Sequence, residues 1–289
     1  MNTTDKLLQE LLTPLERNEQ YQKNIDRFSS EINENKTLLK QLNKSVNYLN
    51  WDFILIEKKG KHKINDFYIC RHLVTQKEFL DVVGINPSFF QTENVTLSMA
   101  KRKMLKDFNT TNNNPVEMVS WYDTLYYCNK RSLLEGYNPV YSINGEVNPD
   151  KWGYTPCKGE TLEKIWLNEK MTGFRLPTYN EWEHAALCGE HYIFEKAECA
   201  EDFIWYRNNS KNITHPVMQK NPNKFGLYDM IGNVWEWCWD SEGEDYHYTR
   251  GGFYDYVGLN RDLKYRRKNH AKYRSNNVGF RIVCSANLH

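Results

Sequence analysis

Residues 225–237 read FGLYDMIGNVWEW, and this stretch decides the fold. A turn at Gly232 leads directly into Trp235 and Trp237, whose large rings we expect to be locked into the core. A second stretch, residues 173–178 (GFRLPT), is expected to place a buried Arg175 beside a strand and to preset a helix N-terminus. Both stretches specify a fold, and neither specifies a reaction.

Short strands, turns and helices are predicted around these stretches. Residues 53–56 and 67–70 have the composition of strands and flank a polar turn at 58–63. Helix starts are indicated by capping residues, and stops by glycine: Thr75 with Glu78 opens a helix through Val83, Ser120 opens one that ends before Gly136, and Thr178 opens one with Trp182, Ala185 and Ala186 facing inward. Long irregular connections follow each helix. Side-chain hydrogen bonds, aromatic packing or metal must therefore fix the loops.

The first 50 residues differ from the rest, since they contain no glycine and one proline, Pro14. Apolar residues from Tyr21 to Leu49 alternate in steps of four and three, with Asn35 at the one polar position. One interpretation is a lone amphipathic helix lying on the following domain. We favour the other, a coiled coil through residues 21–49 that makes a homo-oligomer or docks a partner. The predicted organisation is a helical, coiled-coil segment at 1–50 and one domain at 51–289.

Bulk composition narrows the class of function. A net charge of +1, with 26% charged residues, argues against attraction of the whole molecule to nucleic acid or to an anionic membrane. The N-terminus lacks the pattern of a secretory signal, and no stretch approaches the roughly 20 apolar residues of a membrane span. We therefore expect a soluble, cytoplasmic protein. Seven cysteines without a C-x-x-C pair and eight dispersed histidines indicate neither a zinc site nor a redox motif.

Several ordered blocks resemble formylglycine-generating-enzyme (sulfatase-modifying factor) domains across residues 51–285. The blocks are 66–69, 74–79, 86–90, 114–121 (NPVEMVSW), 173–178 with 181–183, 225–230, 232–237 (GNVWEW), 250–252 (RGG) and 279–281 (GFR). The resemblance implies an α+β, loop-rich, C-type-lectin-like fold, here with an N-terminal helical segment. The shortened opening strand departs from the family pattern, and residues 1–50 lie outside the resemblance.

The resemblance also locates chemistry that this chain lacks. Members that oxidise cysteine to formylglycine hold copper with two cysteines, four and nine residues past the second glycine of the block at 250–252. Those places are Tyr256 and Arg261 here, and neither can replace a thiolate. An iron-dependent branch takes histidines from a helical domain, whereas residues 1–50 contain none. The chain therefore resembles non-catalytic members, such as the variable proteins of diversity-generating retroelements. The alternatives are a metal-dependent oxidase with unrecognised ligands, or an assembly subunit that docks through its N-terminal helix.

One metal site is implied by the resemblance. The family binds a structural Ca²⁺ at positions that match Asp229, Gly232, Val234 and Glu236. Two carboxylates alternating with main-chain carbonyls form the all-oxygen array that Ca²⁺ prefers. The alternative is that these acidic side chains bond to loop amides.

Between Gly252 and Gly279 tyrosine, arginine and asparagine dominate, a composition favoured at binding surfaces. The resemblance places the substrate groove, or the ligand-binding face of variable proteins, in this region. The candidate ligand-binding residues are Tyr254, Tyr256, Asn260, Arg261, Tyr265, Arg267, Asn269, His270 and Tyr273. The expected partner is a protein or peptide. A basic face would suit an acidic peptide or a glycan, with nucleic acid last because no fold for it is recognised. Alternatively the basic residues at 250–281 pair with the acids at 229–245, with Arg266, Arg274 and Arg281 serving the scaffold.

Overall fold

The structure is a computed structural model, and it describes residues 30, 52–57, 64–91, 94, 96–107, 112–159, 161–188, 200–256 and 265–286. Apart from residue 30, these belong to one compact unit, Trp51–His289. The predicted helical, coiled-coil segment at 1–50 lies outside the described residues, except for residue 30, and stays a prediction. The described helices contain no segment with the length and apolarity that crossing a bilayer requires.

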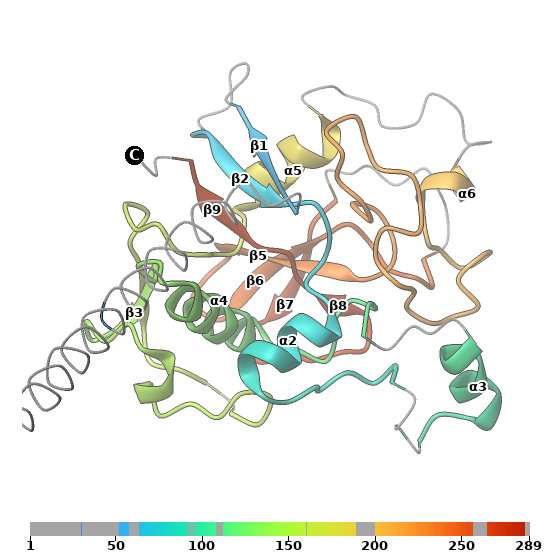
Figure 1. The fold of residues 1–289 in the computed structure, drawn as a ribbon, viewed down its shortest axis with the longest axis horizontal. Coiled ribbons are helices and arrows are strands. Elements are labelled where there is room, and N and C mark those ends of the chain that lie inside the picture. The colour runs from blue at the N-terminus through green and yellow to red at the C-terminus, as the bar shows by residue number, and fades with distance from the viewer. Residues whose placement is uncertain are drawn as a thin grey trace, which may run out of the picture. The chain divides into compact units, whose positions relative to one another are not determined.

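Figure 1 shows short elements joined by long loops. In chain order they are β1 (Phe53–Ile56), β2 (Phe67–Cys70), α2 (Gln76–Val83), α3 (Met99–Asp107), α4 (Trp121–Glu135), β3 (Tyr141–Ile143), the 3₁₀ turn η1 (Pro149–Lys151), β4 (Ile165–Leu167), α5 (Tyr179–Leu187), α6 (Ala200–Phe203), β5 (Trp235–Ser241), β6 (Tyr246–Arg250), β7 (Arg267–His270), β8 (Val278–Gly279) and β9 (Val283–Ser285). The mixed, loop-rich fold predicted from the sequence is confirmed.

The three predicted helix starts are present. The side chains of Thr75, Ser120 and Thr178 each accept a hydrogen bond from the amide three residues later. In return, the side chain of that third residue accepts a hydrogen bond from the amide of the capping residue. Gly84 and Gly136 end α2 and α4 in the left-handed conformation that glycine adopts without strain.

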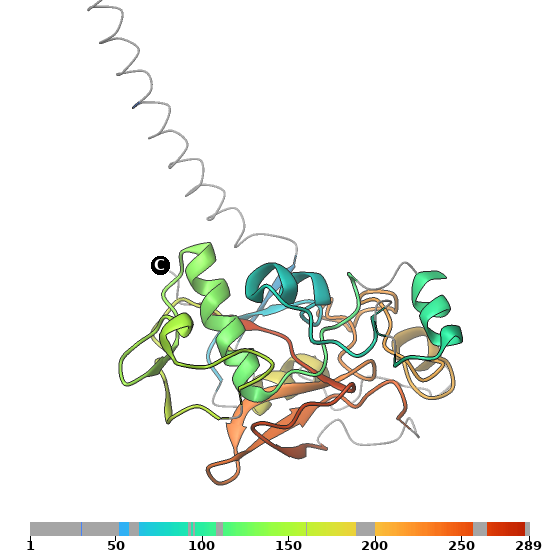
Figure 2. The ribbon, with the colours of Figure 1, turned by 90° about the horizontal axis from the view of Figure 1, so that it is seen from below.

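The described strands form three sheets, with the orders β1-β2-β9, β3-β4 and β7-β6-β5-β8. In the four-stranded sheet, adjacent residues of β5 point to opposite faces. Glu236 accepts a hydrogen bond from the indole of Trp182 in α5, at 2.8 Å. Trp237 instead donates to the carbonyl of Val119, just before α4, at 3.0 Å. The sheet is therefore held between α5 and the start of α4, and Figure 2 shows its β7 edge at the border of the domain.

Buried ion pairs fix the loops around this sheet. Arg175 donates to Glu181 through both terminal nitrogens, at 2.7 and 2.6 Å, as its buried position in GFRLPT predicts. Asp123, at the start of α4, is fully buried and accepts from the side chain of Arg274 at 2.9 Å. The first pair ties the loop before α5 to the first turn of that helix, and the second ties the loop at Arg274 to α4 across 151 residues.

Candidate functional site

Aromatic side chains gather at the end of the four-stranded sheet where β5 begins. Trp235 is 4% exposed, and its ring centroid lies 6.5 Å from that of Phe253, 6.2 Å from Tyr256 and 6.1 Å from Tyr265. We call these four residues the aromatic cluster. Phe253 and Tyr256 follow β6, and Tyr265 precedes β7, so the cluster brings together two parts of the tyrosine-rich segment between Gly252 and Gly279. Tyr265 is 47% exposed, and the cluster therefore reaches solvent on that side.

Tyr256 occupies the first of the two positions at which the family's copper-binding cysteines are expected. Its ring meets that of Trp235 edge-on, and its amide donates to the carbonyl of Phe253 at 3.0 Å. The second position, Arg261, lies outside the described residues. The described cysteines are all free thiols, and four of the six are buried. Within the described ranges no three His, Cys, Asp or Glu side chains come close enough to hold a metal ion.

Two of the predicted ligand-binding residues lie inside the protein. Tyr254 is 5% exposed and packs edge-on against Phe90 at 5.3 Å. Asn269 is also 5% exposed, and its amide donates to the hydroxyl of Thr249 at 3.0 Å. Their burial argues against direct contact with a ligand, because both side chains are occupied within the fold. In a segment without regular periodicity, the sequence could not separate inward from outward side chains.

Other predicted residues lie nearer the surface. Arg267 and Tyr273 contact each other, with the guanidinium 5.5 Å from the ring centroid and a 3.4 Å hydrogen bond to the hydroxyl. His270 is partly exposed and packs edge-on against Tyr246 at 5.4 Å. Asn260 lies outside the described residues. Of the predicted set, Tyr256, Tyr265, Arg267, His270 and Tyr273 are thus partly or fully exposed on segments that adjoin β7 or the aromatic cluster.

Arg266 was assigned to the scaffold in one interpretation of the sequence, but the structure exposes it. Its guanidinium lies 4.8 Å from the ring centroid of Tyr179 and 4.7 Å from that of Tyr248. Arg281 and Arg274 are scaffold residues as predicted, with carboxylate partners Glu236 and Asp123. A strand prediction for residues 267–270 would have revealed the difference, because alternation then sets which arginines face outward.

The predicted calcium ligands differ in how much of their bonding capacity is already used. Glu236 is fully buried and accepts from Arg281 Nε at 2.7 Å, Arg281 Nη2 at 3.0 Å and Trp182 Nε1 at 2.8 Å. A guanidinium already neutralises its charge, so Glu236 does not fit a calcium ion in this arrangement. Calcium at these residues stays a prediction, and an ion would have to displace Arg281.

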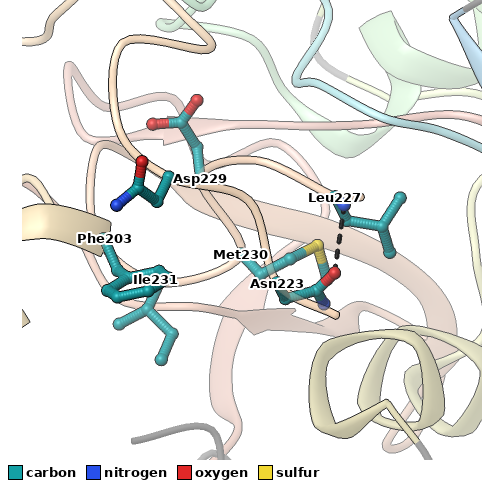
Figure 3. Close-up of a pocket in the computed structure, with 7 residues that line it drawn as sticks. Phe203, Asn223, Leu227, Asp229, Met230 and Ile231 are labelled. Carbon is teal, nitrogen blue, oxygen red and sulfur yellow. Dashed lines mark hydrogen bonds between the residues drawn. The ribbon is translucent and has the colours of Figure 1, made fainter. Parts of the chain in front are cut away.

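Asp229 is the better of the two candidate carboxylate ligands. It is 3% exposed, accepts from the Met218 amide at 3.0 Å, and lies 3.5 Å from the Asn233 side-chain amide. Burial raises the pKa of Asp229 to about 6, against these hydrogen bonds, which lower it. Asp229 also borders a small pocket of about 20 Å³, enough for one water molecule. Figure 3 shows Phe203 and Ile231 on one side of this pocket, and Asn223 bonded to the Leu227 amide on the other.

Comparison with known proteins places the chain in a family. The sulfatase-modifying factor enzyme 1-like domain matches residues 50–286. The chain belongs to this family. A chaperone protein, LppX of Paenibacillus barcinonensis, is 35% identical over 201 residues, which cover 61% of this chain and 63% of LppX. The inactive C-alpha-formylglycine-generating enzyme 2 of Mus musculus is 33% identical over 142 residues, 39% of this chain and 44% of the mouse protein. The matched stretches thus span under two thirds of these relatives.

A solved structure has the same fold over most of this chain of the sulfatase-modifying factor family. Treponema denticola variable protein 1 superimposes with a TM-score of 0.66 and 26% identity, covering 80% of this chain and 94% of the variable protein. CarF, at a TM-score of 0.58 and 22% identity over 82% of this chain and 95% of CarF, shares the fold. The resemblance drawn from the sequence blocks, including the likeness to variable proteins, is confirmed.

Proposed function

We propose that the domain at residues 51–289 is a non-catalytic module that binds a protein or peptide through the aromatic cluster and the adjoining strand β7. The observation that carries this proposal is Tyr256. A ring packed against Trp235 fills the position where the resemblance places a copper-binding thiolate. Loss of that thiolate removes the soft ligand that Cu(I) requires.

The surface beside Tyr256 supports binding. Tyrosine offers rigid, amphipathic contact area, and arginine offers several fixed donors. Tyr265 and Arg266 are exposed, and Arg267 is partly exposed. Among relatives, one is named a chaperone protein, one an inactive enzyme and one a variable protein. These names are consistent with recognition in place of turnover.

The test is a selection of displayed random twelve-residue peptides against the full chain, followed by affinity measurements on point variants. Tyr265→Ala should weaken the selected peptides at least tenfold. Trp166→Ala is the matched control, because Trp166 is 57% exposed on β4 and lies outside the proposed surface. Equal affinity for both variants would show that the aromatic cluster does not bind these peptides.

A second measurement addresses the alternative of a metal-dependent oxidase. Cu(I) titration of the purified chain, with oxygen consumption measured on cysteine-containing peptides, should show no turnover. Stoichiometric copper or iron with turnover would refute the proposal and restore an enzyme.

We also propose that residues 21–49 associate with a second copy, on the strength of their heptad spacing alone. Such pairing would raise the apparent affinity for a multivalent ligand. Light scattering of the full chain and of a variant lacking residues 1–50 tests it. A monomer in both cases would contradict self-association and leave the proposed binding role of the domain intact.

A further inference from the structure

Strand β7 is the edge of the four-stranded sheet and pairs with β6 alone among the described elements. The amide of Ala271 donates to the carbonyl of Asp245 at 2.7 Å. Hydrogen-bonded pairs alternate along an antiparallel ladder, so the bonded partners in β7 are Asn269 and Arg267. The main-chain N–H and C=O of Lys268, between them, therefore point away from β6. In Figure 2 this edge lies at the outer border of the sheet.

Positive charge accompanies that edge on both faces of the sheet. Arg266, Arg267 and Lys268 are consecutive, and alternation sends Arg267 to one face and its two neighbours to the other. Lys268 has an acidic partner, Glu242. For Arg266 and Arg267, no carboxylate within ion-pair distance is found in the part of the chain that the structure describes. Both contact tyrosine rings instead, Arg266 that of Tyr179 and Arg267 that of Tyr273. Arg266 also acts electrostatically on the carboxylates of Asp240 and Glu242 without an ion pair to either.

We propose that β7 receives an extended, acidic segment of a partner protein as an additional strand of the sheet. This inference rests on the proposed function and specifies the class of its ligand. In strand addition the main-chain bonds supply affinity, and alternate side chains supply specificity. The N–H and C=O of Lys268 would pair with the incoming main chain. Carboxylates of the incoming segment would lie beside Arg266 on one face and Arg267 on the other, where opposite charges on neighbouring strands stabilise pairing.

A second copy of this chain is a poorer occupant of the same edge. Two β7 strands paired edge to edge would bring Arg266, Arg267 and Lys268 of both copies together, and like charges across strands destabilise a pair. Charged edge strands are one way in which proteins discourage such self-pairing. The same charges favour an acidic partner, so repulsion of copies and attraction of an acidic segment are compatible.

The test depends on the main-chain N–H of Lys268, which points away from β6. Lys268→Pro deletes the outward N–H without removing a bond between β7 and β6, because proline is tolerated on an edge where its missing donor faces solvent. Lys268→Ala is the matched control, since it removes the same side chain and its pairing with Glu242 but keeps the N–H. The probe is the set of twelve-residue peptides selected from the displayed random library against the full chain.

We expect the selected peptides to be enriched in Asp and Glu. They should bind Lys268→Pro at least tenfold more weakly than Lys268→Ala, and the double variant Arg266→Glu/Arg267→Glu should lose them. As a check that does not depend on the fold of a variant, the selected peptide should bind the unaltered chain at least tenfold more weakly once alternate amides are N-methylated.

Four results would overturn the strand-addition proposal. Equal affinity of the Lys268→Pro and Lys268→Ala variants, or of methylated and unmethylated peptides, would refute it while the Tyr265→Ala effect upholds the proposed function. Selected peptides without acidic residues would refute the ligand class. Self-association of a chain lacking residues 1–50 that disappears in Lys268→Pro would assign the edge to a second copy. A selection that returns no peptide would refute the proposed function together with the inference.

Discussion

Replacing Glu236 with glutamine should lower the free energy of unfolding by about 3–5 kcal/mol, the range for a buried ion pair that loses one partner. Glu236 and Arg281 both have side chains with no exposed surface. Glutamine keeps the shape of the side chain but removes its charge. It also replaces one acceptor oxygen with an NH2 group, which would face a donor of Arg281 or Trp182. Arg281 would keep its bonds to the carbonyls of Cys70 and Tyr228, at 3.0 and 2.9 Å, but its buried charge would be uncompensated.

Urea unfolding followed by fluorescence measures this change, and a double-mutant cycle with Arg281→Met isolates the pair. The double variant should be less destabilised than the sum of the single variants, because it buries no charge. Asp81→Asn is the control. Asp81 pairs with Lys77 on the exposed face of α2, where such pairs contribute about 0.3–0.5 kcal/mol. A loss below 1 kcal/mol for Glu236→Gln, or zero coupling with Arg281→Met, would refute the buried-pair interpretation. A loss seen only with calcium present would instead identify Glu236 as a calcium ligand.

Three further predictions concern pH, backbone space and calcium. Burial lowers the pKa of His247 to about 4, so between pH 6.5 and 4 the unfolded chain binds a proton that the folded chain does not. Acidification across this range should reduce the contribution of His247 to the stability by about 3 kcal/mol, while Glu117 and Asp229, whose pKa values burial raises, act in the opposite direction. The difference in unfolding free energy between wild type and His247→Asn isolates the histidine and should narrow as the pH falls; a constant difference would contradict this. Gly232→Ala should destabilise the fold by more than about 3 kcal/mol, because the new Cβ would lie 2.1 Å from the carbonyl oxygen of Trp205. Gly84 has a similar positive φ, but nothing lies within 4 Å of its Cβ position. Gly84→Ala should therefore cost only about 1–2 kcal/mol, as measured by thermal unfolding. Calorimetric titration with millimolar calcium tests the predicted calcium site: a saturable, stoichiometric heat that is lost in Asp229→Asn would support it, and no heat would contradict it.

Local rules predicted the parts of the fold that depend on neighbours in sequence. Thr75 with Glu78 and Thr178 with Glu181 are three residues apart, so the reciprocal bonds of a capping box can be read directly. The inward face of α5 was also predicted, and Trp182, Ala185 and Ala186 are fully buried. The two strands flanking the polar turn were located with their bounds, because each is a short apolar run between polar residues.

Features that depend on contacts between residues far apart in the sequence could not be predicted from local patterns. β7 reads RKNH and contains no apolar residue, so no strand pattern marks it. Its ladder with β6 supplies the pairing instead. Glu236 was interpreted as a calcium ligand because sequence spacing shows two carboxylates in one loop but cannot show Arg281, 45 residues away, reaching one of them. The basic residues at 250–281 behave in both of the ways considered. Lys268 pairs with Glu242, whereas Arg266 is exposed and, among the described residues, has no carboxylate within ion-pair distance.

The contacts that hold the fold and the residues proposed to bind a ligand occupy different parts of the chain. Arg175 with Glu181, Asp123 with Arg274 and Glu236 with Arg281 all lie outside residues 253–273. Each pair ties an arginine outside the regular elements to a carboxylate in a helix or strand. Side chains between 253 and 273 can therefore change with little effect on these buried pairs. This separation explains how one scaffold can carry thiolates for copper in some members and an aromatic, basic surface here. Membership of the family consequently predicts the core, whereas the function must be argued from Tyr256, Tyr265 and strand β7.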